Sequence, residues 1–231
     1  MVAISQMVSM VPEGLPVAMT IALAVGMQRM AARGALIRRL SAVETLGSTT
    51  TICSDKTGTL TRNEMTAVAL WLPDGQQRQV QGVGYAPVGA VPGAEQPALQ
   101  TLLRAALLCN DAELLPPEDE RASWQVLGDP TEGALLVLAA KAGLDLVAER
   151  AAAPRLAELP FDSEVQMMAT AHGGAAGGVW IKGAPEAVLA LCAPAQQAAA
   201  LAAAAAMAGQ ALRVLAFARA AGPALTDWDS L

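Results

Sequence analysis

The stretch Ser54-Asp55-Lys56-Thr57-Gly58-Thr59-Leu60-Thr61 decides the fold and the chemistry expected of this chain. It follows residues 49–53, a β-branched run suited to a buried strand, and open α/β sheets carry their chemistry where such strands end. The carboxylate of Asp55 can attack a phosphorus atom and hold the phosphoryl group as an acyl phosphate. Backbone amides and hydroxyls stabilise such a group, and the loop offers them at Thr57, Gly58 and Thr59. The stretch therefore predicts an α/β fold with Asp55 as a phosphate-accepting nucleophile.

The first 27 residues predict a helix that crosses a membrane, because Glu13 is their only charged residue and about 20 residues span a bilayer. The segment Pro12-Glu13-Gly14-Leu15-Pro16 interrupts this helix, since two prolines and a glycine cannot continue it. A carboxylate at such a depth indicates a functional site. The basic residues come after the apolar run, so a cleavable signal peptide is not expected. Four arginines without an intervening acid place the chain after about residue 29 in the cytoplasm: Arg29, Arg33, Arg38 and Arg39.

Composition argues against two classes of function. The net charge is −6 and no basic stripe with interleaved aromatic residues occurs, so nucleic acid is not an expected partner. Cys53, Cys109 and Cys192 lie far apart, and His172 is the single histidine, so the four residues do not form a zinc motif. We expect the cysteines to be small buried side chains in a reducing compartment.

From residue 66 onward the chain predicts a second, separate α/β domain. Asp129-Pro130-Thr131-Glu132 starts a helix, with Asp129 as N-cap and Glu132 completing a capping box, and Gly143 ends it. Further helices are expected at residues 41–46, from 99 to about 110, from 185, and at 196–210. Strands are expected at residues 66–71, 77–83, 179–182 and 213–218, with loops at 86–97 and 116–120.

Asp55-Lys56-Thr57-Gly58-Thr59-Leu60-Thr61 matches the phosphorylation signature of P-type ATPases at every position, and the chain resembles that family. The resemblance implies catalytic roles for Asp55, Lys56, Thr57 and Thr59, with Mg²⁺ held by Asp55 and Thr57. It also implies an α+β nucleotide-binding domain inserted in a haloacid-dehalogenase-like phosphorylation domain. Soluble phosphatases of that superfamily have a second aspartate where this chain has Thr57. Without that acid the phosphoenzyme should persist, which favours a pump over a phosphatase.

The interrupted segment at residues 12–16 resembles the broken fourth transmembrane helix of calcium-type pumps. The resemblance implies that Glu13 binds the transported cation, helped by the backbone carbonyls of Val8, Ser9 and Val11. Freed carbonyls and half-helix ends are suited to holding a cation within a membrane. The cation itself is left open between calcium and related ions.

Four later segments resemble signatures of the family's nucleotide-binding domain: residues 128–135, 161–164, 182–186 and 213–216. The resemblance implies that Phe161 stacks on adenine, Lys182 lines the adenosine pocket, and Arg213 meets the phosphates of ATP. Glu132 would support the pocket, although its capping box explains it equally well. Phe161 could instead belong to the core. The family usually has a lysine where this chain has Gln166, so ATP affinity is expected to be reduced.

These observations predict a fragment of an ATP-driven cation pump. Residues 1–28 form the broken transmembrane helix, 29–65 the stalk and first part of the phosphorylation domain, 66–222 the nucleotide-binding domain, and 223–231 a truncated return to the phosphorylation domain. Its partners are ATP, a cation, the lipid bilayer and the pump's remaining domains, and the fragment alone is expected not to pump. The alternative is a stand-alone nucleotide-binding module without catalysis.

Overall fold

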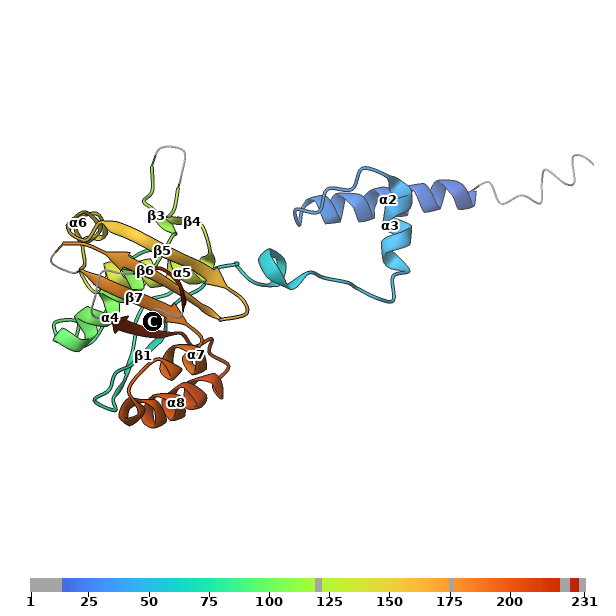
Figure 1. The fold of residues 1–231 in the computed structure, drawn as a ribbon. Coiled ribbons are helices and arrows are strands. Elements are labelled where there is room, and N and C mark those ends of the chain that lie inside the picture. Colours follow the sequence, from blue (N-terminus) through green and yellow to red (C-terminus); the bar gives the residue numbers. More distant parts are fainter. Residues whose placement is uncertain (1–13, 119–121, 175–176, 221–224, 229–231) are drawn as a thin grey trace, which may run out of the picture. The chain divides into compact units, whose positions relative to one another are not determined.

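The computed structural model describes residues 14–118, 122–174, 177–220 and 225–228, and it divides the chain into two compact units. The first unit is Met1–Leu60 and the second is Thr61–Leu231. Each unit is considered by itself below. Figure 1 shows the ribbon of both units with most of the helices and strands labelled.

The first unit contains the apolar helix α2 (Gly14–Ala31) and the short helix α3 (Leu40–Gly47). α2 is long and apolar enough to cross a membrane, and none of its residues is buried. It begins inside the interrupted segment and has Pro16 in its first turn, where a proline is tolerated. α3 confirms the helix expected at residues 41–46. Residues 1–13 lie outside the described range, so the expected break, with Glu13, Val8, Ser9 and Val11, stays a prediction.

The strand expected at residues 49–53 is wrong for this structure. These residues are exposed and form no strand, because a strand requires a neighbour for its backbone groups and no described segment pairs with them. They lead into the turn η1 (Lys56–Leu60), which is not a regular helix, since Gly58 has a φ of 75°. Cys53 is also exposed, contrary to expectation, whereas Cys109 is fully buried.

The second unit is built on a four-stranded antiparallel sheet of β5 (Arg155–Asp162), β6 (Met167–His172), β7 (Gly178–Gly183) and β8 (Ala216–Ala220). The strands lie in chain order, and every residue of β6 and β7 is buried. On one face Met168 and Trp180 pack against Cys109 and its neighbours at the end of α4 (Pro97–Leu108). On the other face Ile181 packs with Val188 of α7 (Pro185–Ala190).

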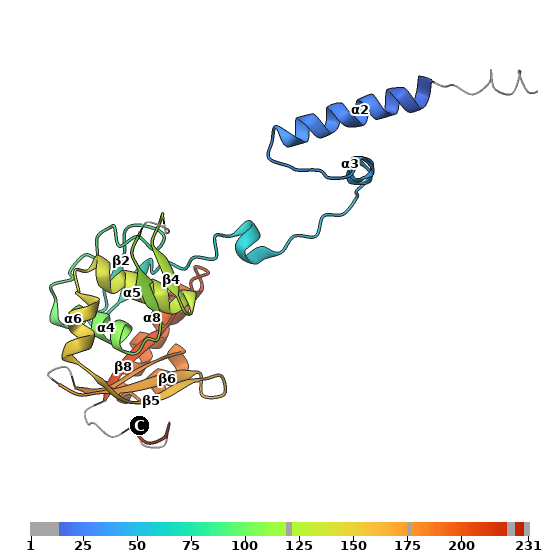
Figure 2. The same ribbon diagram turned by 90° about the horizontal axis from the view of Figure 1, so that it is seen from above.

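Two small hairpins and three more helices complete this unit. β1 (Ala69–Trp71) pairs with β2 (Gln77–Gln79), and β3 (Glu113–Leu115) pairs with β4 (Gln125–Leu127). The helices are α5 (Pro130–Lys141), α6 (Leu146–Ala152) and α8 (Pro194–Ala208). Figure 2 shows α4, α5 and α6 on one side of the large sheet.

The helices expected from capping residues are confirmed, whereas several strands were not foreseen. β1, β2 and β8 are shorter than or shifted from their predicted ranges, and β3, β4, β5, β6 and α6 were missed. β6 gives no alternating pattern because both of its faces are covered. The fold therefore has more sheet than the sequence alone indicated.

Candidate functional site

The N-terminus of α5 is the centre of the candidate site. Asp129 caps the helix, and its carboxylate accepts hydrogen bonds from the backbone N–H groups of Thr131 at 2.7 Å and Glu132 at 3.2 Å. Pro130 occupies the first helical position, where its missing N–H costs nothing. The positive end of the helix dipole therefore points out at this place, fixed by two residues whose roles the sequence predicted.

Glu132 does not complete the capping box. Its carboxylate instead accepts a hydrogen bond from Lys182 Nζ at 2.5 Å and another from the backbone N–H of Asp111 at 3.1 Å. The Lys182 side chain is only 8% exposed and the Glu132 side chain 17%, so the ion pair is largely withdrawn from water. The start of α5 explains the position of Glu132 in the sequence. It does not explain why the Glu132 carboxylate pairs with Lys182.

Asn110 and Asp111 hold this ion pair in place, and sequence reasoning gave them no role. Asn110 is fully buried and donates from Nδ2 to the carbonyl oxygens of Glu132 at 2.9 Å and Ala106 at 3.0 Å. Its Oδ1 accepts from the N–H of Ala112 at 2.9 Å. The bond to Glu132 joins the end of α4 to the start of α5, and the other two hold Asn110 within its own segment. The sequence does show Asn110 as a polar residue directly after an apolar helix. Such a residue more often only ends the helix, so this pattern does not reveal the contact with Glu132.

Arg213 reaches the same helix start from the segment before β8. Its guanidinium lies 3.4 Å from the hydroxyl of Thr131 and carries charge toward Asp129. Burial by itself would raise the pKa of Asp129, but hydrogen bonds from Thr131 and Glu132, aided by Arg213, bring that pKa below its usual value. Asp129 therefore remains ionised as the cap at neutral pH, and Arg213 keeps most of its donors available.

Phe161 lies on β5 and is 64% exposed, which excludes the alternative that it belongs to the core. Asp162 pairs with Met167 on β6, and Met167 pairs with Gly183 on β7, so one row of residues crosses these strands. Phe161 and Lys182 are each the chain neighbour of a residue in that row. Two strand spacings separate their backbones, which is about 10 Å.

The turn between β5 and β6 fixes Gln166 rather than leaving it loose. Gln166 has a φ of 59°, donates its N–H to the carbonyl of Asp162 at 2.7 Å, and accepts from the N–H of Ala184 at 3.0 Å. Its side chain is exposed. The position is therefore held by its backbone, and the side chain can be changed without removing those bonds.

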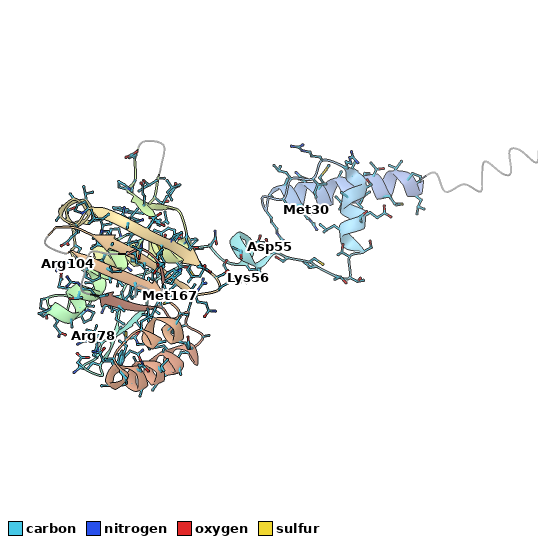
Figure 3. All side chains as sticks on the ribbon, in the orientation of Figure 1. Met30, Asp55, Lys56, Arg78, Arg104 and Met167 are labelled. Carbon is cyan, nitrogen blue, oxygen red and sulfur yellow. The ribbon has the colours of Figure 1, made fainter. Side chains whose placement is uncertain are left out.

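Asp55, Lys56, Thr57 and Thr59 lie in the first unit and are all exposed (Figure 3). Asp55 is the only acidic residue of this turn. Among the described residues, no three or more histidine, cysteine, aspartate or glutamate side chains gather as a metal site. One carboxylate nevertheless fits Mg²⁺ that arrives with a nucleotide, because this ion keeps waters and phosphate oxygens as most of its ligands.

Comparison with known proteins places the chain. The family described as "P-type ATPase, cytoplasmic domain N" matches residues 98–224. The chain belongs to the P-type ATPase family. Glu132, Phe161, Lys182 and Arg213 all fall inside the matched part of this P-type ATPase chain.

Three P-type ATPase relatives show the degree of similarity. The chain is 46% identical over 202 residues to "Cation-transporting ATPase pma1" of Synechocystis sp., covering 82% of this chain and 22% of that protein. It is 50% identical over 199 residues to "Probable cation-transporting ATPase F" of Mycobacterium tuberculosis, covering 82% of this chain and 22% of that protein. It is 42% identical over 175 residues to "Calcium-transporting ATPase type 2C member 1" of Homo sapiens, covering 73% and 18%. The chain thus spans about a fifth of the length of these relatives.

Proposed function

We propose that this chain carries the ATP-binding domain and the phosphorylated aspartate of a cation pump. The observation that carries the proposal is the meeting of Glu132, Lys182 and Arg213 at the start of α5, with the exposed ring of Phe161 on β5, two strands from Lys182 on β7. These residues come from four separate segments of the sequence. The match to a nucleotide-binding family and the names of the relatives support the same activity.

The triphosphate and the adenine of ATP each find suitable groups at this site. A triphosphate is an anion, and the guanidinium of Arg213 is a favourable partner for one. Arg213 is proposed to meet the phosphates, while Lys182 lines the adenosine pocket and Glu132 holds the ammonium in position. Phe161 offers an exposed ring on which adenine can stack, worth about 1–3 kcal/mol per base.

Asp55 is proposed to take the γ-phosphoryl group. A carboxylate oxygen forms a bond to the γ-phosphorus, and the bond from that phosphorus to the bridging oxygen breaks, so ADP leaves with the electron pair. Lys56, Thr57 and Thr59 are proposed to bear charge on the phosphoryl oxygens. Mg²⁺, when bound through Asp55 and Thr57, neutralises phosphate charge. Thr57 offers no carboxylate to activate water, so the phosphoenzyme is expected to last.

Transport is proposed to use the membrane segment that precedes the cytoplasmic units. Glu13 and the carbonyls of Val8, Ser9 and Val11 are proposed to bind the cation, calcium or a related ion, with α2 in the bilayer. Residues 29–65 and 223–231 are proposed to belong to a haloacid-dehalogenase-like phosphorylation domain into which residues 66–222 are inserted. The rest of such a pump would supply further cation ligands.

Nucleotide titration of the full chain tests this proposal at Phe161. Phe161→Ala should lower the affinities for ATP and ADP to a similar extent, by about fivefold to about 150-fold. The two nucleotides are affected alike because the lost contact is with the base. Leu156→Ala is the matched control, because Leu156 lies on the same strand and is 61% exposed. Equal affinities in both variants and the parent would show that the nucleotide binds elsewhere.

A further inference from the structure

A large pocket that is partly open to solvent lies in the second unit, beside the candidate nucleotide site. Its volume is about 840 Å³, within the range of pockets that hold small molecules. Its walls are residues 64–73 and parts of α4, α5, α7, α8 and the segment 211–219. Thr131 and Arg213 belong to its wall, whereas Glu132, Phe161 and Lys182 do not. The pocket therefore adjoins the proposed phosphate contact at Arg213, and its wall leaves out the residues proposed for adenosine.

The sequence of α8 keeps this space open. Four of the six residues of α8 that line it are alanines: Ala195, Gln196, Ala199, Ala200, Ala204 and Met207. Of the whole helix only Ala204 is buried. Protein interiors are normally packed as densely as organic crystals, and a methyl side chain cannot bridge the distance between two layers. The alanines thus leave room where larger side chains would close the core.

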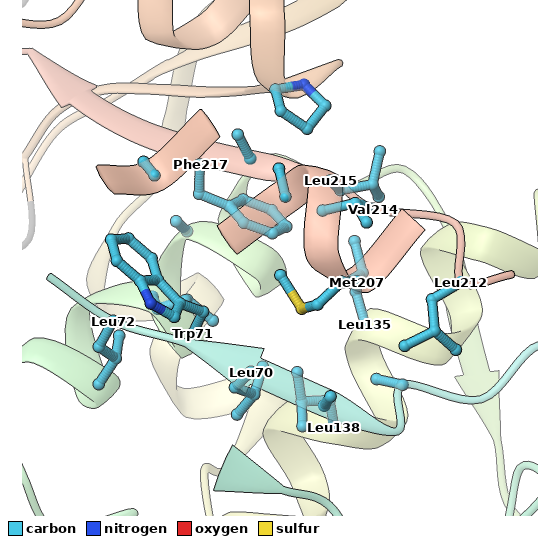
Figure 4. Close-up of a pocket in the computed structure, with 18 of the residues that line it drawn as sticks. Leu70, Trp71, Leu72, Leu135, Leu138, Met207, Leu212, Val214, Leu215 and Phe217 are labelled. Carbon is cyan, nitrogen blue, oxygen red and sulfur yellow. The ribbon is translucent and has the colours of Figure 1, made fainter. Parts of the chain in front are cut away.

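The wall is mainly apolar, with a minority of polar and charged residues that includes Glu64, Arg213 and Arg219. Figure 4 shows Leu70 and Leu138 on one side and Leu215 and Phe217 on the other, with Met207 between them. Trp71 and Trp180 add two large aromatic rings. Pockets that bind small molecules are concave and lined mainly by apolar and aromatic side chains. We propose that this pocket binds an uncharged, mainly apolar small molecule that carries an aromatic ring. This site goes beyond the proposed pumping activity and does not depend on it.

Cysteine protection in the full chain tests the proposal. Cys192 lines the pocket and is half-buried, whereas Cys53 is exposed in the other unit and serves as internal control. The uncharged probe N-phenyl-1-naphthylamine should slow the alkylation of Cys192 by N-ethylmaleimide and leave that of Cys53 unchanged, as measured by mass spectrometry. All samples contain the same detergent concentration, so uptake of the probe by detergent cancels.

Two phenylalanine substitutions on α8 locate the probe. Ala200→Phe places a ring in the pocket and should raise the probe concentration needed for half-protection by about tenfold. Ala205→Phe is the matched control, since Ala205 is exposed and lies outside the wall, and it should leave that concentration unchanged. Absent protection in the parent, or equal protection in both variants, would overturn the proposal. So would a Tm of Ala200→Phe below that of Ala205→Phe, because filling an open space should not destabilise the unit.

Discussion

The buried pair of Glu132 and Lys182 should contribute to stability and nucleotide binding in ways that can be separated. Glu132→Gln keeps an oxygen that can accept from Lys182 and from the N–H of Asp111, but it leaves the ammonium without a counter-charge. Lys182→Met leaves the carboxylate without one. Because the two side chains are 17% and 8% exposed, each change should cost about 3 kcal/mol of unfolding free energy. In a domain of this size that corresponds to a fall in Tm of about 6–12 °C.

The double variant gives the decisive measurement. Glu132→Gln with Lys182→Met removes both charges, and replacing a whole buried pair is often close to neutral. The loss of unfolding free energy in the double variant should therefore be smaller than the sum of the two single losses by about 2 kcal/mol or more. Nucleotide affinity should not recover with stability, because the proposed contact of Lys182 with ATP is still missing. Urea unfolding followed by tryptophan fluorescence, with nucleotide titration of the same samples, measures both quantities.

Two results would refute this reasoning. If the stability losses of the two single variants added up to the loss in the double variant, the pair would have no net coupling. The two charges would then be solvated in solution. A double variant that regained both stability and full ATP affinity would mean that the pair serves only the fold. Asp111 contributes a backbone N–H to Glu132, so Asp111→Ala keeps that contact and removes only the ion pair of Asp111 with Arg155 at 2.6 Å.

Three further predictions concern single positions. Asp55→Asn in a full-length pump containing this chain should abolish acid-stable labelling by γ-labelled ATP, yet leave nucleotide binding unchanged or tighter because a repulsive charge is removed; persistent label would exclude Asp55 as the nucleophile. Gln166→Lys should raise affinity for ATP more than for ADP, by up to about fivefold, since an exposed charge is worth about 0.2–1 kcal/mol; equal gains for both nucleotides would place position 166 away from the γ-phosphate. Burial lowers the pKa of His172 below the ordinary value of 6.5, so the unfolded chain binds the proton first and stability should fall as pH drops below about 6.5. His172→Gln should remove that part of the pH dependence, and thermal unfolding of both proteins from about pH 8 to about pH 5 measures the difference.

The sequence by itself determined the local features of this protein. Asp129 and Pro130 set the start of α5 because a cap and a fixed φ act within one helical turn. The apolar composition of α2 and the signature that begins at Asp55 are also readable without a structure. The residues singled out on α5, β5, β7 and before β8 were all named from short motifs. Such signals need only a few neighbouring residues.

Tertiary structure decided which of these residues meet. Glu132 forms an ion pair with Lys182, fifty residues further along the chain, in place of the predicted capping box. Asn110 donates a hydrogen bond to the backbone of Glu132 and so joins the end of α4 to α5. The strand expected at residues 49–53 did not form, whereas β6 did, covered on both faces. Strand pairing and buried charge pairing depend on groups that only packing brings together, because each group needs a partner from a distant segment when it is removed from water. No local pattern can supply that partner.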